Sequence, residues 1–368
     1  MPTTTIGISG SYGGLNVGDE AILTCMIGEV ARTVPDADIV VFSRDPGHTR
    51  AHHDVDKGVA VREVTREEAV HEVQRLDLLV LGGGGILYDE EVHNYVREVT
   101  LAQERGVPTM AYAIGAGPLK DREDRLVVRD AIGGMDAVTV RDAETKRLLE
   151  EVGVEGDVVV TADPALLLTP VAFPEEALVR EGVSTERRLV GLSVRGRGGA
   201  APTLVDTPYH ALVAAAADFV VDRFDADVVF VPMERADVRE SHRAMAEMAT
   251  PERATVLDGR YGPREVLGFM EHLDVALGMR LHFLILAALA SVPLLALPYA
   301  SKVVELLKVL DTPGPSAHQE RAGPLLAAVD RLWDERHEHR DHLHQRVPAL
   351  KDKARETAGV LERVLTQS

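Results

Sequence analysis

The sequence predicts an α/β protein with two Rossmann-like parallel-sheet domains that face each other across a cleft. Short apolar runs alternate with amphipathic stretches along most of the chain, which is typical of parallel sheets with crossover helices. The alternation breaks between residues 163 and 186, where three X-Pro pairs fall close together. The length of 368 residues is enough for two domains, since a domain has about 150 residues.

The first half is expected to form strands near 5–9, 38–43, 77–82, 108–114, 136–141 and 157–161, with helices such as 20–33, 90–105 and 142–152 between them. The second half is expected to form strands near 188–195, 227–232, 254–257, 274–278 and 293–297. A final helix is expected at about 348–366, after Pro348. We therefore predict an N-terminal domain at 1–170, a C-terminal domain at 171–345 and a C-terminal helix at 346–368.

The charge balance limits the ligands that the protein can hold. It has 40 Lys and Arg against 59 Asp and Glu, a formal net charge of −19. This excess argues against binding to nucleic acid, which needs a basic face, and against docking on anionic lipid by bulk charge. An anionic substrate therefore needs a local cluster of cations. With 45% apolar residues, the chain is globular rather than disordered.

The single cysteine, Cys25, excludes an internal disulfide and a site with several cysteine ligands for a metal. The N-terminus lacks a basic region followed by an apolar one, so we expect no signal peptide. Residues 283–301 carry no charge, but Pro293 and Pro298 interrupt them, and a membrane span needs about twenty apolar residues. We expect a buried helix, a turn and a strand there, in a cytoplasmic protein.

Ligands of open parallel sheets bind beyond the carboxyl ends of the strands, so the residues there are the first candidates. The loop 10–20 follows the first strand and is rich in glycine, but it lacks the G-x-G-x-x-G spacing of nicotinamide dinucleotide sites. Asn16 and Asp19 in this loop are candidates for ligand contact and, at even odds, for turn and helix-cap chemistry.

Glycines also follow the next two strands. Gly83 and Gly84 belong to a run of four, which we expect to expose bare backbone with free amides. Gly115 and Gly117 follow the strand at 108–114. Together with the first loop, these strand ends are expected to form the floor of one pocket.

Three arginines are the first cationic candidates. Arg141 ends a strand and either binds a ligand or pairs with Asp142 at the surface. Arg195 ends a strand of the second half, and Arg197 follows it in a loop suited to an anion. Arg280 also follows a strand, and no residue nearby in the sequence is able to neutralise it.

His282 and Lys302 extend this cationic set. His282 precedes an apolar helix, whose N-terminus favours anions, and either serves in catalysis or packs in the core. Lys302, one of only seven lysines, holds the corresponding position after the next strand. The histidines at 337, 339, 342 and 344 lie in a charged run without apolar support, which favours a solvated helix face over a metal site.

These motifs together resemble the polysaccharide pyruvyltransferase family. The resemblance rests on the loop 10–21, the glycines 82–85, the segment 113–118, Val140-Arg141-Asp142, Asp163-Pro164-Ala165, Arg280-Leu281-His282, and Tyr299 with Lys302, in the order of the family. It implies a GT-B-like fold and transfer of pyruvate from phosphoenolpyruvate to a sugar, with formation of a ketal and release of phosphate.

The resemblance also implies roles for individual residues. His282 becomes the general acid, and the donor is held by Arg141, Arg280, Leu281 and Lys302. Arg195 is a further donor candidate because of its place at the end of a strand. The acceptor sugar would meet Tyr12, Asn16, Asp19, Gly83 and Gly84. Asp19 and Asp163 are the candidates for the base. One departure is that family members often carry an aromatic residue near Leu15, and this chain has none, so its acceptor is open.

The expected partners are phosphoenolpyruvate as co-substrate and a sugar or lipid-linked glycan as acceptor. No metal, further cofactor or nucleic acid is expected. Peripheral attachment to a membrane through the acceptor and a homo-oligomeric state both stay open. A GT-B-like glycosyltransferase that uses a nucleotide sugar is the main alternative, and a sugar-binding protein without catalytic activity is a weaker one.

Overall fold

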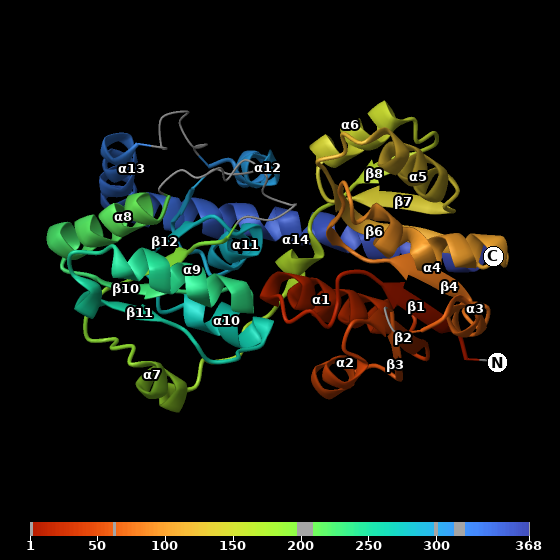
Figure 1. Cartoon of the computed structure of the whole chain (residues 1–368), viewed down its shortest axis with the longest axis horizontal. Helices are drawn as coiled ribbons and strands as arrows, with labels where there is room; N and C mark the ends of the chain where they lie inside the picture. The colour runs from red at the N-terminus through yellow and green to blue at the C-terminus, as the bar shows by residue number, and fades with distance from the viewer. Residues whose placement is uncertain (1–2, 62–63, 197–208, 298–300, 313–320, 368) are drawn as a thin grey trace. The chain divides into compact units, whose positions relative to one another are not determined.

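The computed structural model describes residues 3–61, 64–196, 209–297, 301–312 and 321–367. The chain divides into two compact units (Figure 1). Unit 1 comprises Met1–Leu167 and Ala349–Ser368, and unit 2 comprises Leu168–Pro348. Each unit is built on its own parallel sheet with helices against it, as the sequence predicts.

The sheet of unit 1 has the strand order β3-β2-β1-β4-β6-β7-β8. The strand β5 also pairs with β6, at residues of β6 that follow those paired with β4. All these pairs are parallel, so the carboxyl ends of the strands lie at one edge. The strands are β1 (Thr5–Ser9), β2 (Asp38–Ser43), β3 (Lys57–Ala60), β4 (Leu78–Leu81), β5 (Gly84–Leu87), β6 (Thr109–Ala116), β7 (Ala137–Val140) and β8 (Val158–Val160).

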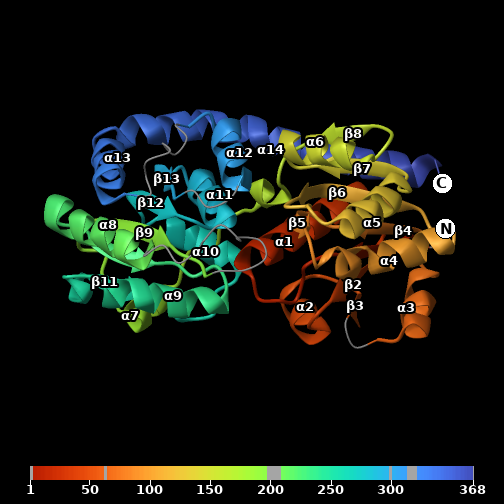
Figure 2. The same cartoon turned by 45° about the horizontal axis from the view of Figure 1, so that its top comes forward.

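The two faces of this sheet are covered by different helices. One apolar core joins the sheet to α3, α4, α5 and α6, and Figure 2 shows α4 beside α5. The apolar side chains of α1 lie outside that core, because α1 packs on the opposite face, against β5. The helices are α1 (Val17–Thr33), α2 (Pro46–His52), α3 (Arg66–Val73), α4 (Val92–Glu104), α5 (Arg122–Gly133) and α6 (Ala143–Val152), and a 3₁₀ turn, η1, spans Pro164–Leu167.

The sheet of unit 2 has the order β11-β10-β9-β12-β13, again with parallel pairs only. Its strands are β9 (Leu189–Ser193), β10 (Asp227–Phe230), β11 (Ala254–Val256), β12 (Val275–Gly278) and β13 (Leu294–Ala296). The helices are α7 (Glu175–Glu181), α8 (Tyr209–Phe224), α9 (Arg235–Ala246), α10 (Pro263–Met270), α11 (Leu281–Leu289), α12 (Ser301–Leu310) and α13 (Ala322–Asp334), and a 3₁₀ turn, η2, spans Pro251–Arg253.

The expected strands of both halves are confirmed, but two further strands and the start of the last helix differ from the prediction. β3 was not expected, and neither was β5, which forms from the second half of the glycine run. The last helix, α14 (Arg336–Gln367), begins twelve residues before Pro348 and continues through this proline. The rule that proline ends a helix therefore gave the wrong start, although a proline inside a helix does remove one hydrogen bond.

The glycine run of unit 1 generates a prediction about stability. A Cβ atom on Gly82 would lie 1.9 Å from the Oη atom of the fully buried Tyr12, whereas a Cβ on Gly28 of α1 would meet nothing within 4 Å. We expect Gly82→Ala to destabilise the protein by about 1–3 kcal/mol through overpacking. Gly28→Ala is the control and should stabilise it by about 0.5–1 kcal/mol, because alanine favours a helix.

Thermal unfolding of both variants measures these effects. Because Tyr12→Phe removes the crowded oxygen, it should recover part of the loss in the Gly82→Ala background. Equal melting temperatures for wild type and Gly82→Ala would show that the contact between Tyr12 and Gly82 does not constrain the fold.

Candidate active site

The glycine-rich loop after β1 ends in a capped helix at the carboxyl edge of the sheet. The Asn16 side chain accepts a hydrogen bond from the Gly18 amide at 2.9 Å, and α1 begins at the next residue, Val17. Asp19 stands in the first turn of α1, and its carboxylate lies 3.6 Å from the position of a Cβ on Gly84. Asn16 therefore caps the helix, and Asp19 lies beside the glycine run.

The backbone of the glycine run makes more contacts within the protein than the sequence predicts. The Gly82 amide donates to the Ser9 carbonyl at 2.6 Å, and Gly84 pairs with Ile114 in the ladder between β5 and β6. Gly83 packs closely, since a Cβ there would lie within 3.3 Å of Ile22 of α1 and Pro164. The expectation of free amides is therefore wrong for Gly82, and Gly84 lies in a strand with a positive φ of 102°. Gly82 and Gly83 are needed instead for close packing.

Tyr12 lies inside unit 1 rather than at its surface. Its side chain is 0% exposed, its hydroxyl donates to Met26 Sδ at 3.3 Å, and burial raises the pKa of the phenol well above its usual value. The ring lies against Gly10 and Gly82, where any side chain would clash with it. We therefore no longer expect the Tyr12 side chain to contact an acceptor, because its ring is buried and packs against Gly10 and Gly82.

Arg141 is buried between two carboxylates. It donates to Asp163 at 3.1 Å and to Asp142 at 3.4 Å, and it is 8% exposed. Its guanidinium covers Gly115, where a Cβ would lie 2.8 Å from it. Arg141 thus pairs with Asp142 as in the structural alternative, but it does so in the interior and with Asp163 as a second partner.

The cationic candidates of unit 2 follow three neighbouring strands. Arg195 follows β9, Arg280 and His282 follow β12, and Lys302 follows β13. β12 lies between β9 and β13 in the sheet, and adjacent strands are about 4.8 Å apart. The parallel sheet therefore places the carboxyl ends of the three strands that precede these candidates side by side at one edge. Arg197 and Tyr299 lie outside the described residues.

Arg280 has two acidic partners that the sequence did not reveal. Its Nε donates to Asp237 at 2.8 Å, and its Nη2 donates to both Asp237 and Glu234. Burial alone would lower the pKa of Arg280, but these carboxylates raise it above its usual value. No residue nearby in the sequence neutralises Arg280, as expected, but Glu234 and Asp237 at the start of α9, 46 and 43 positions earlier in the chain, supply two carboxylates.

His282 and Lys302 both stand at the start of helices. Arg280 is the residue before α11, Leu281 is its buried first residue, and His282 is the second, with Nε2 buried. Lys302 is the second residue of α12 and is partly buried. The free amides and dipole of a helix N-terminus favour an anion at such positions.

A further group at the edge of unit 1 was missed by sequence reasoning. Arg44 follows β2, and its Nη2 donates to the hydroxyls of Ser11 at 3.2 Å and Tyr95 at 3.0 Å. The same rule that singled out Arg141 and Arg195, a cation at the end of a strand, would have found Arg44.

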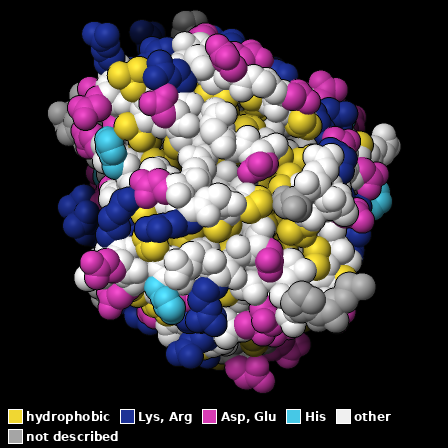
Figure 3. Space-filling model, turned by 90° about the vertical axis from the view of Figure 1, so that its right-hand side faces the viewer, with side chains coloured by type: hydrophobic (Ala, Val, Ile, Leu, Met, Phe, Trp, Pro, Cys, Tyr) yellow, Lys and Arg dark blue, Asp and Glu magenta, His cyan; other side chains and the backbone are white. Residues whose placement is uncertain are grey.

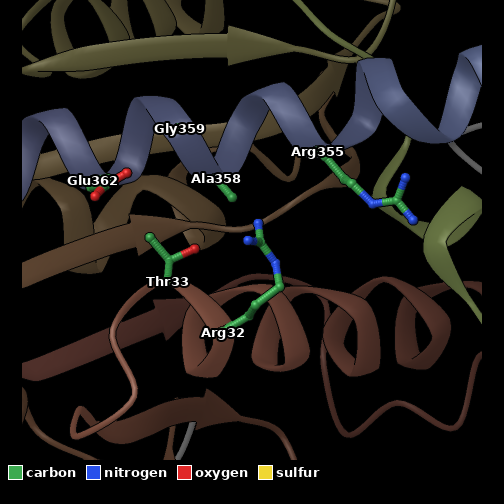
Figure 4. Close-up of a pocket in the computed structure, with 6 residues that line it drawn as sticks. All are labelled: Arg32, Thr33, Arg355, Ala358, Gly359 and Glu362. Atoms are coloured by element: carbon green, nitrogen blue, oxygen red, sulfur yellow. The ribbon is translucent and has the colours of Figure 1, made fainter.

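A surface pocket of about 330 Å³ lies elsewhere in unit 1. It is lined by Arg32, Thr33, Arg355, Ala358, Gly359 and Glu362, from the end of α1 and from α14 (Figure 4). Since α1 has 17 residues and a helix rises 1.5 Å per residue, this pocket lies roughly 25 Å from Asn16. It is separate from the strand-end residues.

Three further observations concern the surface charge, the helices and metal binding. Figure 3 views the molecule from the side on which both termini lie in Figure 1, and acidic and basic side chains are interspersed there. Within the described ranges, no helix is long and apolar enough to cross a membrane. The same part of the chain holds no group of three His, Cys, Asp or Glu residues placed to bind a metal ion.

Solved structures share this fold. A putative UDP-N-acetylglucosamine 2-epimerase from Listeria monocytogenes has a TM-score of 0.68 at 14% identity, over 97% of this chain and 94% of that one. The ADP-heptose heptosyltransferase II of E. coli has a TM-score of 0.51 at 13% identity, over 90% of this chain and 99% of that one. At such identities the likeness shows the fold alone, which is GT-B-like as expected.

Comparison with curated proteins finds no match. The model of one family, polysaccharide pyruvyl transferase, matches residues 16–301. The matched segment contains β2 to β13 and every strand-end candidate from Asn16 to Arg280, with His282. The chain therefore belongs to the polysaccharide pyruvyl transferase family.

Proposed function

We propose that the protein transfers pyruvate from phosphoenolpyruvate to two hydroxyls of a sugar in a glycan or glycan precursor, forming a ketal and releasing phosphate. Membership of the family supports pyruvyl transfer to a polysaccharide. The observation that carries the donor assignment is the row of Arg195, Arg280 with His282, and Lys302 after three neighbouring strands.

The donor would bind mostly to unit 2. Phosphoenolpyruvate carries a carboxylate and a phosphate, so it needs concentrated positive charge in a chain of net charge −19. A planar guanidinium suits the carboxylate, and lysine acts as a point charge on the phosphate. We assign the carboxylate to Arg195 and Arg280, with Leu281 beside them, and the phosphate to Lys302. Arg141, which belongs to unit 1, remains a further donor candidate.

Arg280 would change partners when the donor binds. Asp237 is fully buried and contacts two nitrogens of the guanidinium, whereas the side chain of Glu234 is 33% exposed. The donor carboxylate would displace Glu234 and leave Asp237 in place. Asp237 thus positions Arg280, and Glu234 competes with the substrate for it.

The reaction needs one proton donor and one base. His282 would protonate the methylene carbon of phosphoenolpyruvate, which makes C2 electrophilic, and its imidazole is suited because its ordinary pKa is near neutrality. One sugar hydroxyl attacks C2, the second closes the ketal as phosphate leaves, and the two hydroxyl protons balance the new methyl group and the phosphate. Asp19 is the better base, because Asp163 is buried and paired with Arg141.

The acceptor would meet unit 1 at the loop before α1, near Asn16, Asp19, Gly83 and Gly84. The Asp19 carboxylate is partly exposed beside Gly84, where a sugar hydroxyl would lose its proton. A lipid-linked acceptor would attach the protein peripherally to a membrane.

Phosphate release tests the proposal against a glycosyltransferase that uses a nucleotide sugar. We expect inorganic phosphate from phosphoenolpyruvate only when a suitable sugar acceptor is present. Consumption of a nucleotide sugar with no release from phosphoenolpyruvate would favour the glycosyltransferase. Binding of sugars without either reaction, over a full panel of acceptors, would indicate a protein without catalytic activity.

Removal of a positive charge and removal of a negative charge at the donor site should have opposite effects on the kinetics with phosphoenolpyruvate. Lys302→Ala should lower kcat/KM for phosphoenolpyruvate roughly ten- to over a hundredfold, since a charge-assisted contact contributes about 1.5–3 kcal/mol. Glu234→Gln should instead lower the donor KM about two- to fivefold, because a partly exposed pair contributes about 0.2–1 kcal/mol. Steady-state kinetics with varied donor measures both, and unchanged donor kinetics in both variants would remove these assignments.

His282 is tested by two substitutions. His282→Ala should cut kcat about a hundredfold or more, as expected for loss of a general acid. His282→Gln keeps a polar group of similar reach without a transferable proton and should be equally slow, with a melting temperature near that of wild type. Near-normal kcat in His282→Gln would mean that His282 only positions the donor, and collapse of the melting temperature in both variants would mean that it is a core residue.

A further inference from the structure

We propose that Arg44, Ser11 and Tyr95, here called the Arg44 cluster, bind an anionic group, a phosphate or a carboxylate, of the acceptor substrate. This inference rests on the proposed pyruvyl transfer and adds a charge to the acceptor. The cluster lies in unit 1, at the carboxyl ends of β1 and β2 and beside α4.

Three elements fix the position of Arg44. Its backbone amide donates to the Tyr12 carbonyl at 3.0 Å, which ties the end of β2 to the loop after β1. Its Nη2 donates to Ser11 Oγ at 3.2 Å and to Tyr95 Oη at 3.0 Å, and Tyr95 Oη donates to Ser11 Oγ at 3.3 Å. The guanidinium is therefore oriented before any ligand arrives.

Arg44 is paired with hydroxyls rather than with carboxylates. Within the described ranges, its side chain forms no ion pair with a carboxylate, whereas Arg141 and Arg280 each contact two. Both partners of Arg44 are neutral hydroxyls, although the chain has 59 acidic residues. A partly buried cation without a counter-charge is costly, and a bound anion would offset that cost.

The absence of a side chain at Gly14 leaves room beside the guanidinium. Gly14 is exposed, and a Cβ there would lie 3.1 Å from Arg44 Nη1, so any side chain at this position would crowd that nitrogen. Arg44 itself is partly exposed. Since both hydrogen bonds to the hydroxyls come from Nη2, we assign the incoming anionic group to Nη1.

The neighbourhood of the cluster fits a sugar that carries the anion. A guanidinium matches the oxygens of a phosphate or carboxylate, and an aromatic ring can lie against a sugar. Tyr88 is partly exposed, with its ring centroid 6.3 Å from that of Tyr95. The loop that carries Ser11 and Gly14 continues into Asn16 and Asp19, which places the cluster on the acceptor side.

Binding calorimetry with phosphoenolpyruvate present at saturation tests the inference. The probes are N-acetylglucosamine 1-phosphate and glucuronate, each against its uncharged sugar, N-acetylglucosamine or glucose. We expect Arg44→Met to raise the Kd of one charged probe about ten- to a hundredfold and to leave its uncharged partner unchanged. Arg147→Met, which removes an exposed arginine paired with Glu151 on α6, is the matched control and should change neither Kd.

Two milder variants keep the test valid if Arg44→Met fails to fold. Arg44→Lys keeps the charge but loses the fork of donors, and Tyr95→Phe removes one hydroxyl that orients Arg44, so both should weaken the charged probe by less. The probe that responds separates phosphate from carboxylate recognition. Wild type that binds charged and uncharged probes equally, or variants that lose melting temperature but keep the preference, would overturn the inference.

Failure of the proposed function is distinguishable from failure of this inference. Phosphate release that is equally efficient with charged and uncharged acceptors would leave pyruvyl transfer in place and overturn the role of the Arg44 cluster. Preference for a charged probe that depends on Arg44, without phosphate release from any acceptor, would instead overturn pyruvyl transfer and retain the cluster as an anion site.

Discussion

Parallel pairing of the strands is the constraint on which the candidate site depends. Every strand of each sheet runs the same way, so the residues that follow the strands collect at one edge. In unit 2 this places Arg195, Arg280 and Lys302 after β9, β12 and β13, although they are spread over more than a hundred positions of the sequence. No local motif would gather three cations in this way.

Carboxylates control how these cations are presented. Asp237 holds Arg280 and Asp163 holds Arg141, both in the protein interior, where breaking such a pair leaves an unbalanced charge. Some of the acidic residues therefore fix the positions of arginines. Arg44 differs from them, since hydroxyls orient it, and in our proposal its charge binds an anionic group of the acceptor. Unit 1 thus holds arginines in two different environments, Arg141 between carboxylates and Arg44 beside hydroxyls.

The fold was predictable because its signals are local. Apolar runs such as those at β4 and β12 mark buried parallel strands without knowledge of the partners. The site was predictable only in part. The partners of Arg280 lie on α9, far away in the sequence, and the burial of Tyr12 depends on its packing against Gly10 and Gly82, so neither shows in a local pattern. Gly83 and Gly84 stand out in the sequence, but Gly83 packs closely against α1 and Pro164, and Gly84 belongs to a strand with a φ of 102°.

Transfer of labelled carbon tests the central claim most directly. Phosphoenolpyruvate with ¹³C at C2 would be incubated with the enzyme and a glycan acceptor, and the product would be examined by NMR. The account predicts that the label appears as a ketal carbon bonded to two oxygens of the sugar, with one phosphate released for each ketal. Label found only in free pyruvate or in unchanged phosphoenolpyruvate, with an acceptor that the protein binds, would contradict it.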